Sequence, residues 1–253
     1  MKTSFISIVL FLIFITGYLD VLSQDQMPGN QANSMYAKAL PSNQRQFDVI
    51  ADNQSSFNAG NTDNPYMGTK GSMYYYDEWK TGKVVLSDNS VMDNVQLRYN
   101  IYAKQMQFTN GKDTLAFAKP EELKSITIEG KVFIYTEYKF GTETRSDYFE
   151  VVTDGRCKLL ARRVVKYHKE IDENLHTCET DIFDKSCELY IKKGDSPAEL
   201  VKCDKKSICH HFNDKQDLMQ AFIMEHNMKI KTREDLAMLV EYYNSLESLV
   251  VGR

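Results

Sequence analysis

The stretch Val95–Phe117 reads VQLRYNIYAKQMQFTNGKDTLAF, and its alternation of apolar and polar side chains decides the fold. Strict alternation is typical of an antiparallel strand with one face buried and the other in water. Asn110-Gly111 separates two such runs, and this dipeptide accepts the positive φ of a tight hairpin turn at low cost. The buried face is predicted to hold Val95, Leu97, Tyr99, Ile101, Met106, Phe108, Leu115 and Phe117. The wet face is predicted to hold Gln96, Arg98, Asn100, Gln105, Gln107 and Thr109.

The same period of two extends to both sides of this stretch, from Tyr74 to about Lys169. Pro120 marks a single helical turn within it, and short turns divide the rest at Asp88-Asn89, Glu129-Gly130 and Asp154-Gly155. Turns of this length cannot join parallel strands, because parallel pairs need long crossover connections. The sequence therefore predicts an antiparallel β-meander, curled as a sandwich or a small open barrel.

After residue 204 the apolar period changes to 3.6, which is typical of amphipathic helices. A short helix is predicted over 205–212. A capping box at Asn213 and Gln216 predicts the start of a second helix, and Thr232 predicts the start of a third. The apolar face of the third helix is Leu236, Leu239, Val240, Tyr243 and Leu246. The expected fold class is α+β, a β-meander followed by a small C-terminal helical cap.

The first residues indicate an export signal. Lys2 precedes the apolar run ISIVLFLIFI at 6–15, and Val21-Leu22-Ser23 offers a cleavage site. A retained anchor is the alternative, but Asp20 interrupts the run before the roughly 20 apolar residues that spanning requires. The protein is therefore predicted to be exported to the periplasm or the outer envelope, with no transmembrane span after cleavage.

Shifts in composition divide the chain into parts with different expected roles. The polar residues after the signal lack an apolar pattern, so they cannot offset the entropy of ordering. The predicted parts are a signal peptide (1–23), a flexible polar leader (24–65), an antiparallel β domain (66–170), an acidic Cys-containing loop with a short hairpin (171–203) and a helical subdomain (204–253).

The charge balance makes a nucleic acid partner unexpected. The chain has 31 Lys and Arg residues and 35 Asp and Glu residues, so its net charge is −4. The stretch Arg156–Lys169 is nevertheless basic throughout. A functional interpretation is an anion-binding stripe formed by Arg156, Lys158, Arg162 and Lys166. The alternative, which we favour, is a solvated face that meets the acidic residues following it in the chain.

All five cysteines lie between Cys157 and Cys209, and their odd number leaves at least one outside any intrachain disulfide. Cys178 and Cys187 are the best disulfide candidates for an exported protein, although Cys203 could pair with either. A metal site is a weaker alternative, because the close cysteine pairs of zinc sites are absent. Its candidate ligands are His176, Cys203, Cys209 and His210. No cofactor is expected.

Motifs for enzymatic chemistry are missing from the sequence. It contains no Gly-rich phosphate loop, no G-x-S-x-G elbow and no H-E-x-x-H pair. The adjacent acids Asp77-Glu78 and Glu121-Glu122 are typical of exposed turns. Tyr74-Tyr75-Tyr76 with Trp79 indicates either a stacking surface for a sugar or the packing of a strand end, and packing is the expected role.

Several segments resemble an uncharacterised family of exported proteins of Bacteroidetes-type bacteria. The matching segments are Gly82–Asp88 (GKVVLSD), Leu97–Asn100 (LRYN), Met106-x-Phe108, Asp113–Phe117 (DTLAF), Phe149–Val151 (FEV), Leu159-Leu160, Glu234–Leu236 (EDL) and Leu239–Asn244 (LVEYYN). The resemblance implies a signal, a set of strands and a helical tail. It implies no activity and no catalytic residue, because none is assigned to that family. The stretch 169–187 looks like an insertion relative to the family pattern.

Three functions follow as hypotheses. The leading one is a non-enzymatic exported envelope protein that acts as a binding or assembly module, with another envelope protein or a glycan as its partner. The second is an enzyme that acts on envelope or extracellular glycans through a carboxylate pair. The third is a metal- or redox-responsive module that uses the Cys/His cluster.

Overall fold

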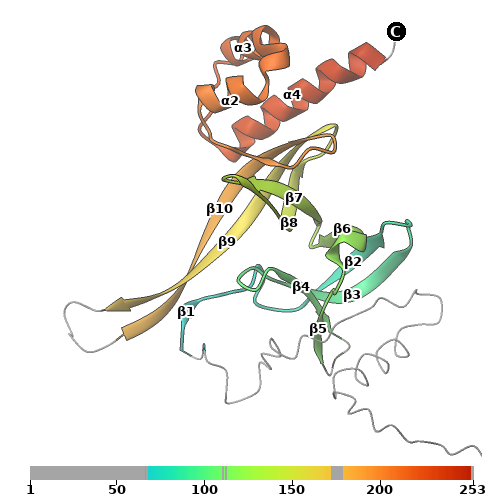
Figure 1. Cartoon of the computed structure of the whole chain (residues 1–253), viewed down its shortest axis with the longest axis vertical. Coiled ribbons are helices and arrows are strands. Elements are labelled where there is room, and N and C mark those ends of the chain that lie inside the picture. Colours follow the sequence, from blue (N-terminus) through green and yellow to red (C-terminus); the bar gives the residue numbers. More distant parts are fainter. Residues whose placement is uncertain (1–65, 67, 110, 112, 172–178, 252–253) are drawn as a thin grey trace, which may run out of the picture.

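The computed structural model describes residues 66, 68–109, 111, 113–171 and 179–251. Within them a large antiparallel-rich sheet carries a group of helices at one end, so the predicted α+β class is confirmed (Figure 1). The sheet is open and does not close into a barrel. The predicted signal peptide and leader lie outside the described residues. The strands are β1 (Lys70–Gly71), β2 (Lys80–Leu86), β3 (Val91–Asn100), β4 (Gln105–Thr109), β5 (Thr114–Ala116), β6 (Leu123–Ile128), β7 (Lys131–Phe140), β8 (Glu143–Thr153), β9 (Cys157–Ile171), β10 (Glu179–Lys193) and β11 (Glu199–Val201).

The strands do not form one continuous meander. The order across the sheet is β1-β10-β9-β8-β7-β6-β2-β3-β4-β5, with β11 beside β10. After β5, the chain passes through the 3₁₀ turn η1 (Pro120–Glu122) and crosses to the other side of β2, where β6 pairs with β2 in antiparallel fashion. Gly82 permits this close pairing, because a Cβ there would collide with the carbonyl oxygen of Thr127.

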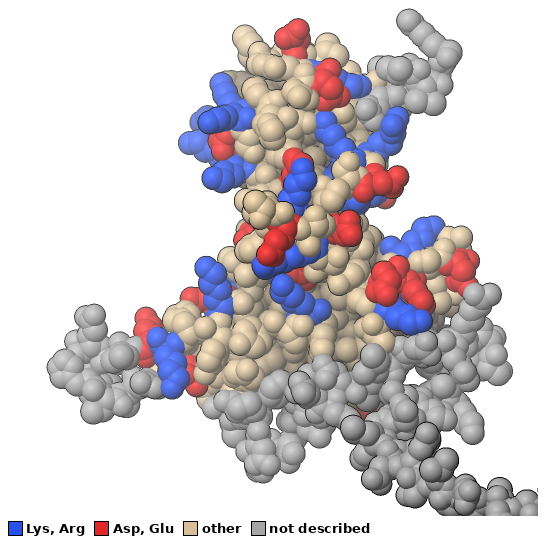
Figure 2. All heavy atoms as spheres, viewed as in Figure 1, with Lys and Arg blue, Asp and Glu red and all other residues tan. Residues whose placement is uncertain are grey.

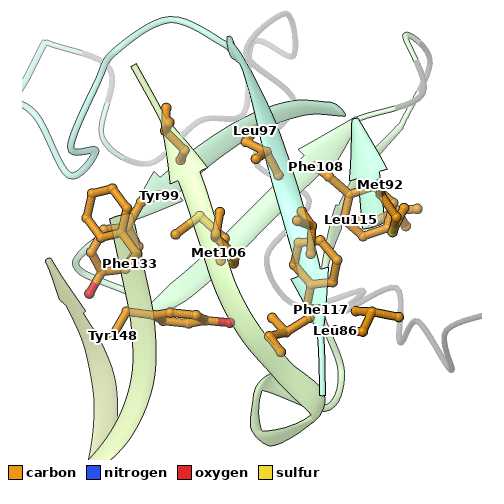
Figure 3. Packing of buried hydrophobic residues seen from close by; sticks show 14 of the residues in the cluster. Leu86, Met92, Leu97, Tyr99, Met106, Phe108, Leu115, Phe117, Phe133 and Tyr148 are labelled. Carbon is orange, nitrogen blue, oxygen red and sulfur yellow. The ribbon is translucent and has the colours of Figure 1, made fainter. Parts of the chain in front are cut away.

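The β3–β4 hairpin buries the face that the sequence predicts. Four of its side chains are at most 7% exposed, namely Leu97, Tyr99, Met106 and Phe108. They belong to one hydrophobic cluster, which we call the lower core (Figure 3). Rings from β7 and β8, including Phe133 and Tyr148, complete this core. The alternation therefore locates the core correctly.

The opposite face of the same hairpin is buried in part, so the prediction for that face is wrong at three residues, while Gln96 is exposed as predicted. Arg98, Asn100 and Gln107 are 6%, 1% and 2% exposed. The reason lies in the segment Ser72–Trp79, which pairs with the end of β3 through the Tyr74–Asn100 bridge. It places the rings of Tyr74 and Trp79 over Arg98 and the sulfur of Met73 beside Asn100. Residues that precede β2 therefore bury polar side chains of β3.

A long hairpin replaces the loop that the sequence predicts after residue 170. β9 and β10 pair without interruption from Cys157 opposite Lys193 to Ile171 opposite Glu179. Acidic residues of β10 stand opposite basic residues of β9, and such pairs stabilise a sheet. These pairs are Lys169–Asp181, Lys166–Asp184 and Arg162–Glu188.

Four aromatic rings gather on the outer half of this hairpin, which extends away from the helices in Figure 1. Tyr167 and Phe183 are cross-strand partners, and their ring centroids are 5.3 Å apart. Tyr102, from the β3–β4 turn, and Tyr66 lie 5.4 and 5.2 Å from Phe183. This four-ring cluster attaches the outer half of the hairpin to the β3–β4 turn.

The helical end comprises α2 (Lys205–His211), the 3₁₀ turn η2 (Asn213–Lys215), α3 (Gln216–Glu225) and α4 (Arg233–Val251). Thr232 caps α4 as predicted, because its hydroxyl accepts the Asp235 N–H at 3.1 Å. The predicted capping box at Asn213 is wrong, since that residue begins η2 and α3 has no side-chain cap.

The apolar face of α4 packs on the sheet. Leu236, Leu239, Val240 and Tyr243 are buried in one cluster with Cys157, Leu159 and Ile191 of β9 and β10. Among the described residues, none of the helices combines the length and the apolar character needed to cross a membrane.

Candidate functional site

Two buried carboxylates on β8 are each surrounded by cations. Strand β8 buries four consecutive residues, Asp147 to Glu150, so both of its faces are covered. Asp147 accepts hydrogen bonds from Arg162 at 3.4 Å and from the Tyr99 hydroxyl at 3.3 Å, and Lys104 Nζ lies 3.8 Å away. Burial raises the pKa of Asp147, and these neighbours only partly oppose that shift.

Glu150 binds three cations and one hydroxyl. Its carboxylate accepts hydrogen bonds from Arg233 (2.7 Å), Tyr75 (2.9 Å), Lys131 (3.2 Å) and Arg163 (3.3 Å). Burial opposes ionisation, but the bonds from Arg233 and Tyr75 and the nearby positive charges outweigh it and lower the pKa of Glu150 to about 2. Since Arg233 begins α4, this group ties the helices to the sheet.

Arg98 is buried with less compensation than either carboxylate. Its guanidinium carbon lies 3.9 Å from the ring centroid of Tyr74 and 4.3 Å from that of Trp79. Stacking on aromatic faces stabilises a cation but satisfies none of its N–H groups. Arg98 Nε is buried with no hydrogen-bond partner, and burial lowers the pKa of Arg98, although Tyr74 and Asp77 oppose this.

Gln107 stands directly opposite Arg98 in the β3–β4 ladder and is also left unsatisfied. Its Oε1 is buried and accepts no hydrogen bond. A donor and an acceptor without partners therefore lie on neighbouring strands of one sheet face. We call Arg98, Gln107 and the two rings stacked on Arg98, Tyr74 and Trp79, the covered polar face.

The predicted anion stripe is divided between different environments. Arg162 is buried and bonds Asp147, Glu188 and the Tyr138 hydroxyl. Lys158 pairs with Asp154, while Arg156 and Lys166 are exposed. Acidic residues of β10 stand opposite basic residues of β9. Figure 2 likewise shows side chains of both signs interspersed on the face it presents.

The predicted cysteine and metal candidates are not brought together in the described part of the chain. Among the described residues, Cys187, Cys203 and Cys209 form no disulfide with one another. Cys178 and His176 lie outside the described residues, so the Cys178–Cys187 disulfide stays a prediction. No three His, Cys, Asp or Glu side chains among the described residues are gathered so as to hold a metal ion.

His210 lies on the helical end, away from any such grouping. It lines a recess of about 230 Å³ together with Lys193, Glu199 and His211. His211 is 9% exposed, and one of its ring nitrogens lies 3.2 Å from the Leu200 carbonyl oxygen. Burial lowers the pKa of His211.

Sequence reasoning missed Arg98 and Gln107 as site residues, because both occupy positions predicted to face water. The signal that pointed to this place was the aromatic run at Tyr74 with Trp79. Two of its rings stack on Arg98, whereas Tyr75 packs on Phe133 with centroids 5.3 Å apart. The run therefore combines a packing role with a stacking role.

No family model, no curated protein and no solved structure matches this chain. The covered polar face, the predicted export signal and the paired state of the buried carboxylates are thus the basis for a functional interpretation.

Proposed function

We propose that this protein is exported and works in the cell envelope as a non-enzymatic binding module, whose partner is another envelope component that contacts the covered polar face. The predicted signal peptide at 1–23 supports the location. The buried carboxylates Asp147 and Glu150 are neutralised by cations, which supports a structural role for them rather than a catalytic one.

The observation that carries the proposal is the unsatisfied state of Arg98 and Gln107. A buried polar group without a hydrogen bond costs about 1–3 kcal/mol, and a charged group costs more. An apolar pair at these two positions would remove that cost. A ligand that forms hydrogen bonds with both groups would offset this cost, so the two residues are suited to binding a ligand.

The location is tested by producing the full chain in a bacterium of the predicted envelope type and separating its compartments. The expected result is a protein in the envelope or periplasmic fraction whose first residue is Gln24. Retention in the cytoplasm with Met1 intact would contradict the export part of the proposal.

The binding role is tested by crosslinking in intact cells that carry the wild-type chain or an Arg98→Leu/Gln107→Leu double variant. We expect a defined crosslinked species with wild type that is lost with the double variant. A Gln96→Leu variant is the matched control, because Gln96 lies on the same face of β3 but is exposed. Identical crosslinking in all three chains would contradict binding through this face.

A further inference from the structure

We infer that the covered polar face binds an uncharged saccharide through one of its hydroxyl groups. This inference rests on the proposed function and names the ligand class for the same site. It starts from the register of β3 and β4, which puts Arg98 opposite Gln107, so that an unsatisfied N–H donor and an unsatisfied oxygen acceptor belong to cross-strand partners on one sheet face.

The chemistry of the two atoms selects the ligand group. A group that satisfies both must accept a hydrogen bond from Arg98 Nε and donate one to Gln107 Oε1. A hydroxyl does both, whereas a carboxylate or a doubly ionised phosphate only accepts. An ionised acid would bond Arg98 but would also place its charge near the Gln107 oxygen. If the amide were turned to present its NH₂, an acid would fit instead, so acidic sugars form a separate arm of the test.

The aromatic rings favour the same class of ligand. Tyr74 and Trp79 are only partly buried, so each keeps some exposed ring surface. Such rings offer an apolar body to the C–H groups of a sugar while hydrogen bonds fix its hydroxyls. Their stacking also holds the guanidinium flat, which orients its donors before a ligand arrives.

Access to the buried atoms follows from the backbone of the covering segment. Residues Tyr75 to Glu78 have no regular secondary structure, although Tyr75 N–H bonds the Tyr99 carbonyl oxygen at 2.9 Å. Trp79 directly precedes Lys80, which pairs with Leu97 of β3, so its backbone is fixed and its ring is held over Arg98 by stacking alone. Displacement of that ring exposes Arg98 Nε to a ligand.

The experiment uses Trp79 itself, because it is the only tryptophan of the chain. Its fluorescence is followed while neutral trisaccharides of glucose, mannose, galactose and N-acetylglucosamine are added, with trigalacturonate as the acidic arm. We expect a saturable change with at least one neutral trisaccharide. The affinity should fall at least tenfold in Arg98→Leu and in Gln107→Leu and stay unchanged in Gln96→Leu.

Gln107→Glu separates a loss of binding from a loss of folding. The new carboxylate stands opposite Arg98 and pairs with it, so the denaturation midpoint should rise while saccharide binding is lost. The inference is overturned by saturation with no neutral trisaccharide, by saturation with trigalacturonate alone, or by binding that survives in both leucine variants. If the trisaccharides fail but the double variant still loses its crosslinked species, the ligand class is wrong and the binding role stands.

Discussion

Asn244 shows how one side chain positions a whole helix. Its Oδ1 accepts the Cys157 N–H at 2.9 Å, and its Nδ2 donates to the carbonyl oxygens of Cys157 (2.8 Å) and Asp154 (3.3 Å). The amide thus acts as a neighbouring strand would act toward the start of β9. Gly155 makes room for it, because a Cβ there would collide with the Asn244 amide.

Asn244→Asp should lower the free energy of unfolding by about 1–3 kcal/mol, since the carboxylate has no donor for the two carbonyl oxygens. Urea denaturation measures this change. The matched control is Asn227→Asp at an exposed position with φ of 49°, where aspartate is also tolerated. Equal urea midpoints for the two variants would show that the hydrogen bonds of the Asn244 amide contribute nothing to stability.

Glu150 gives the protein a defined dependence on pH. Its pKa in the folded chain is about 2, below the ordinary value of 4.5. The carboxylate therefore contributes stability that is complete above about pH 5 and is lost as the pH falls toward 2, with an amplitude of about 3 kcal/mol. The midpoint of urea denaturation, measured from pH 6 down to pH 2.5, should fall steeply for the wild type and more gently for Glu150→Gln.

Asp147→Asn is the control for that experiment. Burial raises the pKa of Asp147, so its ionisation costs stability as the pH rises. Removing that ionisation should leave the fall of the urea midpoint at low pH at least as steep as in the wild type. A shallower fall in Asp147→Asn, together with an unchanged fall in Glu150→Gln, would mean that Asp147 and not Glu150 causes the pH dependence.

At the scale of the element, the predictable parts are those whose partners are close in sequence. The β3–β4 hairpin, the turn at Pro120 and helix α4 all follow from a local period or a local cap. Strand β10 was missed because its charged residues match those of β9, and that match is visible only once the register is known. The covered polar face was missed because its cover comes from residues outside the hairpin.

Phe183→Ala tests how the outer half of the β9–β10 hairpin is held. The substitution removes the ring that contacts Tyr66, Tyr102 and Tyr167. Amide exchange should become at least tenfold faster in the outer half of the hairpin, because those amides depend on the four-ring cluster for protection. Amides at the inner end, near residues 157–162, should keep their rates.

Phe140→Ala provides the comparison, since Phe140 is 47% exposed on a different hairpin. It should leave exchange in β9 and β10 unchanged. Equal acceleration in both variants, or acceleration along the whole hairpin in Phe183→Ala, would mean that the cluster has no local role.

At the scale of the molecule, three hydrophobic cores share the same strands. The lower core includes Tyr148 of β8. A second cluster, around Tyr138, includes Phe149 of β8 and Leu160 of β9. The third cluster, which holds the apolar face of α4, includes Leu159 of β9. Neighbouring residues of one strand thus belong to different cores. The α+β class was predictable, but the place where the helices pack and this sharing of strands were not, because both depend on contacts between distant parts of the chain.

The shared strands predict a single unfolding transition. Trp79 fluorescence reports on the β2–β3 end, and circular dichroism at 222 nm reports mainly on the helices. The two signals should give the same urea midpoint within error, as expected for a two-state domain. Two separated midpoints would show that the helices and the sheet are independent units.

The pairing of β1 with β10 also has a consequence for the order of folding. Lys70 lies opposite Ile182, so this pair closes only after most of the sheet has been synthesised. Contacts between residues so distant in sequence form slowly, because the entropy of closing the loop must be overcome first. Tyr74, Trp79, Arg98 and Gln107, in contrast, lie within one short stretch of chain. We therefore expect the covered polar face to form early, before β1 has paired with β10.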